Sequence, residues 1–131
     1  MIPKERQELV KYRITKARET FNEVELHTEN KLWNTAINRL YYACYYAVIA
    51  LLIDREIKAE SHAGVRQMFG MHFIKTGIIE KELGKFYTDI FDMRQTGDYE
   101  DYIDFKKSDV LDLIKPANSL ISKIEKLLIH K

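Results

Sequence analysis

Residues that could do chemistry gather in the stretch RQTGDYED, from Arg94 to Asp101. The guanidinium of an arginine presents a planar fork of N–H donors that matches the oxygens of a phosphate. Two interpretations of this stretch stay open. In one, Arg94 holds a phosphate in a groove. In the other, Asp98, Tyr99 or Asp101 pairs with a buried Arg94 and fixes the end of a helix, because a buried arginine needs a partner.

A second group of polar side chains lies earlier, in NRLYYACYYAV. The tyrosine pairs at positions 41–42 and 45–46 recur at i,i+4 spacing, so they form two adjacent stripes along a helix. Their rings can fill the core while their hydroxyls reach its rim. Arg39 comes one helical turn before Tyr42. The alternative interpretation is therefore that Arg39, Asn38 and Tyr42 face a polar groove.

Other site chemistries have little support in the sequence. The chain contains no Glu-x-x-His pair, and no two of its four histidines are four residues apart. We therefore expect no metal and no cofactor. The single cysteine, Cys44, lies in an apolar run and is expected to be a small buried hydrophobe. One cysteine without a partner suits a reducing compartment.

Charge and hydropathy restrict the partners and the location. The formal net charge is +1, from 21 basic and 20 acidic residues, so no field of the whole molecule would steer it onto a polyanion. Nucleic-acid binding would need a local patch or a symmetric assembly. The apolar run Leu40–Ile53 is shorter than the roughly 20 residues that span a bilayer. We expect a buried central helix, no membrane association and a cytoplasmic location.

The elements that must position these residues are all predicted to be helices within one domain, residues 1–131. Apolar residues recur at helical spacing, and no alternation typical of strands is present. The fold class is therefore predicted to be all-α, a bundle with short connections. The five predicted helices cover approximately Lys4–His27, Lys31–Arg55, His62–Lys75, Ile79–Thr96 and a segment that starts at Ser108.

Capping residues and helix breakers refine these boundaries. Ser61 is the predicted N-cap of the third helix, and Gly77 follows its end. The remaining boundary predictions are an N-cap at Thr28 or Asn30 for the second helix, a stop at Gly97, an N-cap at Ser108 and a kink at Pro116.

Three segments, NRLYYACYYAVIALL, SHAGVRQMFG and RQTGDYED, resemble the HEPN domain. More narrowly, they are similar to the small stand-alone HEPN proteins that prokaryotes encode beside minimal nucleotidyltransferases. The resemblance extends from about Lys4 to Leu128. It implies an up-and-down bundle of four main helices with a short extra helix. It also implies a homodimer in which the ends of the two fourth helices meet.

The resemblance also implies an activity. Many HEPN proteins are metal-independent ribonuclease toxins with an R-x4-6-H motif, in which the arginine grips a phosphate and the histidine moves a proton. Arg94 matches the arginine, but Tyr99 occupies the histidine position. The tyrosine that often follows the histidine would fall on Asp101, with Tyr102 one residue further. A phenol with a pKa near 10 is a poor general base at neutral pH.

Two functions follow as hypotheses. The first, which the missing histidine favours, is a homodimeric binding partner of a minimal nucleotidyltransferase. Its nucleotide or RNA-phosphate groove would contain Arg39, Tyr42, Arg94, Asp98, Tyr99 and Tyr102. The resemblance implies that Tyr99 or Tyr102 could accept a nucleotidyl group. The alternative is a ribonuclease toxin whose R-x4-Y motif uses Arg94 and Tyr99.

Histidines elsewhere in the chain could reach this groove only through the fold. His62 and His72 both lie on the predicted third helix. We expect His62 simply to open that helix beside its cap. A position near the dimer cleft, together with Arg66 one turn further on, is the alternative.

Overall fold

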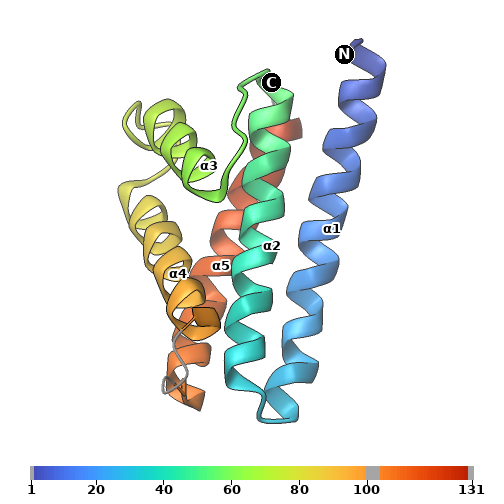
Figure 1. Ribbon diagram of the computed structural model, residues 1–131. Coiled ribbons are helices and arrows are strands. Elements are labelled where there is room, and N and C mark those ends of the chain that lie inside the picture. Colours follow the sequence, from blue (N-terminus) through green and yellow to red (C-terminus); the bar gives the residue numbers. More distant parts are fainter. Residues whose placement is uncertain (1, 100–103, 130–131) are drawn as a thin grey trace.

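The computed structural model describes residues 2–99 and 104–129, with side chains described up to residue 96 and again from residue 104. No strand occurs in these ranges, which confirms the all-α fold (Figure 1). The elements are α1 (Pro3–Glu29), α2 (Trp33–Asp54), α3 (His62–Phe69), the π-helical turn η1 (Gly70–Ile74), α4 (Lys81–Tyr99) and α5 (Lys107–Ile129).

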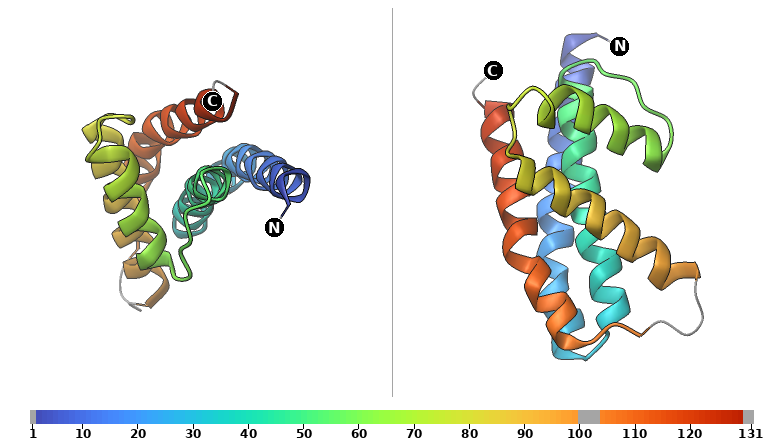
Figure 2. Two further views of the ribbon diagram at one scale, coloured as in Figure 1. Left: turned by 90° about the horizontal axis from the view of Figure 1, so that it is seen from above. Right: turned by 90° about the vertical axis from the view of Figure 1, so that its left-hand side faces the viewer.

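The four long helices form an up-and-down bundle around α2. The helix α2 contacts α1, α3, α4 and α5. Figure 2 shows α1 and α2 side by side, and α5 contacts both of them as well as α4. The short helix α3 crosses over α2 and leads through η1 into α4. The arrangement confirms the predicted bundle of four main helices and a short extra helix.

The central position of α2 follows from its composition, because apolar residues surround most of its circumference. By length and composition alone, this helix could also cross a membrane. Here it is the core helix, and Cys44 lies fully buried within it, as expected for a small hydrophobe. Its buried residues are Ala36, Ile37, Leu40, Tyr41, Ala43, Cys44, Ala47, Val48, Ala50, Leu51, Leu52 and Asp54.

The boundaries of the third helical segment are partly those expected. The Ser61 hydroxyl accepts a hydrogen bond from the backbone N–H of Gly64 at 2.9 Å, which confirms the predicted N-cap. Gly77 has a φ of +80°, a conformation that glycine adopts without steric cost. Regular α-helix ends at Phe69, however, and the chain continues as the π-helical turn η1. We predicted one uninterrupted helix, so this change of winding was missed.

The predicted N-cap of α2 is wrong. The helix begins at Trp33 without a hydrogen bond from a capping side chain. The Thr28 hydroxyl instead donates to the Val24 carbonyl at 2.9 Å, and the Asn30 amide donates to the Leu26 carbonyl at 2.8 Å. Both side chains therefore satisfy carbonyls at the end of α1, which extends further than the apolar stripe indicated.

The ends of α4 and α5 also differ slightly from expectation. The helix α4 passes through Gly97 to Tyr99, since one glycine in a helix costs only about 1 kcal/mol relative to alanine. The helix α5 starts at Lys107, and the Asp109 carboxylate accepts a hydrogen bond from the backbone N–H of Lys106 at 2.9 Å. The N-cap is thus not Ser108. The predicted kink at Pro116, which lies inside α5, stays a prediction.

Candidate arginine–aromatic site

Arg94 lies on the core-facing side of α4, although it is the residue with the strongest indication of function in the sequence. Only 8% of Arg94 is exposed. It follows Tyr87, Ile90 and Phe91 at helical spacing, and all three are buried. Its guanidinium carbon is 4.9 Å from the centre of the Tyr41 ring and 5.7 Å from that of Tyr42. These are favourable cation–π distances.

His62 reaches the same place from the first position of α3. Its Nδ1 atom forms a hydrogen bond of 2.7 Å with the hydroxyl of Tyr41, whose side chain is fully buried. The half-buried imidazole stacks on the Tyr45 ring, with ring centres 4.2 Å apart and an interplanar angle of 13°. It meets the Tyr42 ring edge-on. The fold therefore brings a histidine to the tyrosines that contact Arg94.

Two further arginines lie over neighbouring aromatic rings, Arg39 over Tyr42 and Arg66 over Phe91. The Arg39 guanidinium lies over the Tyr42 ring at 5.1 Å and donates to the Asn38 side-chain oxygen at 2.9 and 3.2 Å. Arg66, one turn after His62, lies 4.4 Å from the centre of the Phe91 ring. We define the Arg94 cluster as Arg39, Tyr41, Tyr42, Tyr45, His62 and Arg94.

Burial sets the protonation of the titratable groups in the Arg94 cluster. Desolvation, and then the nearby charge of Arg94, lowers the pKa of His62 below its usual value near 6.5, so the imidazole is neutral at pH 7. Desolvation also raises the pKa of Tyr41 and, less strongly, that of Tyr45. The phenols stay protonated, and the charge of the Arg94 cluster comes from its arginines.

The structure brings together Arg39, Tyr42 and Arg94, three of the residues predicted for the groove. The side chains of Asp98 and Tyr99, and the whole of Tyr102, lie outside the described residues. Their predicted roles as partners of Arg94, as the motif position or as modification sites stay predictions.

Tyr41 and Tyr45 were missed as members of this site, and His62 was only the alternative to a residue that simply opens its helix. His62 does open α3 beside its Ser61 cap, but it also contacts three tyrosines. The tyrosine stripes indicated a special face of α2. The sequence contains no signal for the crossing of α3 over that face, and this crossing decides which residue meets the rings.

Other parts of the described chain offer less chemistry. Among the described residues, no group of three or more His, Cys, Asp or Glu side chains could hold a metal ion. A groove of about 710 Å³ lies between α1 and the starts of α2 and α5, with Trp33, Leu111 and Ile114 in its lining. The surface of this groove is largely apolar. The Arg94 cluster is therefore the better candidate.

The fold and the site together define a class, the all-α bundles that carry an arginine-based polar site on their third long helix, here α4. The chain belongs to the HEPN domain family, whose model matches residues 10–127. It is 39% identical over 124 residues to a UPF0332 protein of Thermotoga maritima, covering 95% of this chain and 94% of that protein.

Archaeal relatives are similar over most of their length. The chain is 34% identical over 118 residues to a Methanocaldococcus jannaschii protein whose name is "putative toxin", covering 90% of this chain and 80% of the relative. A second protein of that organism with the same designation is 33% identical over 99 residues, with 76% and 74% covered. These matches confirm the family resemblance found in the sequence.

Proposed function

We propose that this chain is a HEPN-domain component of a toxin–antitoxin-like pair and that its Arg94 cluster binds the phosphate of a nucleotide or an RNA. The observation that carries the proposal is the Arg94 guanidinium, held against the rings of Tyr41 and Tyr42 beside His62. Guanidinium groups bind phosphate oxygens in a bidentate manner, and aromatic faces stack on nucleobases. The relatives named as toxins support this assignment.

The proposed assembly is a homodimer that binds a minimal nucleotidyltransferase as its partner. One chain has a net charge of only +1, so two copies of the Arg94 cluster in one cleft would create the local positive potential that a single chain lacks. In this assembly, Tyr99 or Tyr102 is the acceptor for nucleotidyl transfer. Sedimentation equilibrium tests the first part, and a mass near 15.5 kDa at all concentrations would contradict the dimer.

The binding proposal is tested with a fluorescent single-stranded RNA oligonucleotide and the Arg94→Ala variant. A hydrogen bond to a charged group contributes about 1.5–3 kcal/mol, so we expect Kd from fluorescence anisotropy to rise roughly 10–100-fold. Arg94→Lys keeps the charge but loses the fork, and should bind with intermediate affinity.

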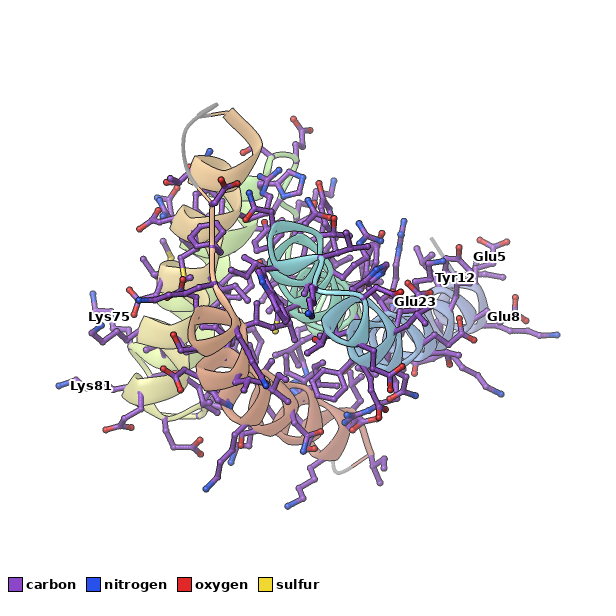
Figure 3. All side chains as sticks on the ribbon, turned by 90° about the horizontal axis from the view of Figure 1, so that it is seen from below. Glu5, Glu8, Tyr12, Glu23, Lys75 and Lys81 are labelled. Carbon is purple, nitrogen blue, oxygen red and sulfur yellow. The ribbon has the colours of Figure 1, made fainter. Side chains whose placement is uncertain are left out.

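The matched control for this experiment is Lys81→Ala. Lys81 starts the same helix, and its side chain projects into solvent on the side opposite to Glu5, Glu8 and Glu23 of α1 (Figure 3). The substitution removes the same charge from the same helix, so it corrects for a nonspecific electrostatic effect. An equal rise in Kd for Arg94→Ala and Lys81→Ala would contradict a binding site at Arg94.

A second candidate function is metal-independent ribonuclease activity, in which the R-x4-Y motif supplies Arg94 and Tyr99. The observation that favours it is the neutral imidazole of His62, which could act as a base where the phenol of Tyr99 could not. Cleavage of RNA in the presence of EDTA, lost in Arg94→Ala, would support this function. Intact RNA at high protein concentration would contradict the ribonuclease function, and only the binding function would remain.

A further inference from the structure

We propose that His62 is the proton-transferring residue of the Arg94 cluster and that Tyr41 is the residue that positions it. This inference rests on the ribonuclease form of the proposed function. The imidazole that the R-x4-Y motif lacks at position 99 is supplied instead from the start of α3, a separate part of the chain.

The contacts of His62 hold its ring in a defined orientation. The hydrogen bond of 2.7 Å to Tyr41 engages Nδ1. The stack on Tyr45 and the edge contact with Tyr42 fix the plane of the imidazole. Ser61 caps α3 one residue earlier and anchors the backbone. A ring held on three sides keeps its second nitrogen, Nε2, in a constant position, which proton transfer requires.

The charges around His62 suit a base. It faces Arg94 from α4 and the phenols of Tyr41, Tyr42 and Tyr45 from α2, while Arg66 follows one turn later on its own helix. Burial and then the nearby charge of Arg94 lower the pKa of His62, so the neutral imidazole is favoured. His62 and Arg94 both contact the side chain of Tyr41, which places them in the same part of the site.

The reaction this arrangement supports is transesterification of RNA. With Nδ1–H donating to the Tyr41 oxygen, the lone pair of Nε2 removes the proton of the ribose 2′-hydroxyl. The 2′-oxygen then forms a bond to phosphorus, and the bond from phosphorus to the 5′-oxygen breaks. The 5′-oxygen takes a proton from water, and the imidazolium returns its proton to the resulting hydroxide. Arg94 stabilises the negative charge that develops on the phosphate oxygens.

The experiment separates binding from cleavage. Binding is measured by anisotropy with a 2′-O-methyl RNA oligonucleotide, which lacks the nucleophile. Cleavage is measured with the unmodified oligonucleotide in EDTA. General base catalysis contributes typically 10²–10⁴-fold, so we expect His62→Gln to reduce cleavage by about that factor while Kd changes by less than about twofold. His72→Gln, an exposed histidine of η1, is the matched control and should behave as wild type.

Two more variants distinguish chemistry from folding. Added imidazole should restore cleavage by His62→Ala, since it replaces the missing base. Tyr41→Phe keeps the buried ring but removes the hydroxyl that engages Nδ1. We expect it to lower cleavage by about 2–10-fold and to move the acid limb of the pH–rate profile. A purely structural role for Tyr41 would leave that limb in place.

The outcomes are distinct. Wild-type cleavage by His62→Gln overturns the inference, and so does a lack of rescue by imidazole in folded His62→Ala. If wild-type protein binds the oligonucleotide without cleaving it, the proton-transfer role is overturned while phosphate binding by the Arg94 cluster stands. If wild-type protein binds neither oligonucleotide, the proposed function itself fails.

Discussion

At the scale of single residues, the Arg94 cluster keeps a cation inside a largely aromatic environment. The Arg94 guanidinium interacts with two ring faces, and cation–π contacts contribute about 0.5–2 kcal/mol each, depending on desolvation. The phenols of Tyr41 and Tyr45 have raised pKa values, so they do not neutralise Arg94 as phenolates. The arrangement thus keeps the positive charge of Arg94 against the aromatic faces of α2.

The lowered pKa of His62 predicts how stability depends on pH. In the unfolded chain this histidine titrates near pH 6.5, and in the folded protein it titrates lower. Below about pH 6.5 the unfolded state therefore binds the proton first, and the free energy of unfolding falls as pH falls. We expect His62→Gln to lose less stability than wild type between pH 8 and pH 5.

Urea unfolding followed by the fluorescence of Trp33, the single tryptophan, measures this effect. His72→Gln, which removes an exposed histidine, should retain the pH dependence of wild type. If the free energy of unfolding depends on pH in the same way for wild type and His62→Gln, then His62 is not the source of the acid sensitivity.

At the scale of elements, α4 and η1 approach each other closely at a glycine. A Cβ atom on Gly84 would lie 2.9 Å from two carbons of the Ile74 side chain, whereas a Cβ on Gly70 would meet nothing within 4 Å. Overpacking costs about 1–3 kcal/mol, and replacing a helical glycine by alanine gains up to about 1 kcal/mol. We therefore expect Gly84→Ala to destabilise the protein.

Chemical denaturation of a double-mutant series checks this expectation. In an Ile74→Ala background the obstruction is gone, so Gly84→Ala should become stabilising. Gly70→Ala is the control for the gain in helix propensity when alanine replaces glycine, and it should not destabilise the wild-type protein. If Gly84→Ala has the same effect with and without Ile74, the close contact does not limit the packing of α4 on η1.

The helices and their caps show which features of the fold could be predicted from the sequence. The spacing of apolar residues was enough to predict the main helices. The Ser61 N-cap could be predicted because a serine directly before an amphipathic helix is a local sequence signal. Thr28 and Asn30 were misassigned because the same side chains can serve either end of a helix. Arg94, Arg39 and Tyr42 could be grouped through a family motif. His62 could not, because its position depends on the crossing angle of α3.

At the scale of the whole molecule, Asp54 joins three helices at one end of the bundle. Its carboxylate accepts hydrogen bonds from Gln7 of α1 at 3.0 Å and from the adjacent Arg55 at 3.1 Å. Arg55 also donates to the Leu127 carbonyl of α5. The Asp54 side chain is only 1% exposed, so water cannot replace these contacts.

Breaking this connection should cost far more than breaking a surface ion pair. Loss of one partner from a buried pair typically costs about 3–5 kcal/mol, so we expect Asp54→Ala to lower the free energy of unfolding by about 3 kcal/mol. Asp89→Ala removes the same group from an exposed pair with Lys85 and should cost less than about 1 kcal/mol. Urea denaturation compares the two, and equal losses would contradict a central role for Asp54.

The burial of Cys44 has a practical consequence for studying the proposed homodimer. Burial raises the pKa of its thiol, and no part of the side chain is exposed to solvent, so alkylating reagents should not reach it in the native protein. A cysteine introduced by Lys81→Cys would then be the single reactive handle of the chain, with the native thiol left in place. A spin label there would report the separation between two protomers.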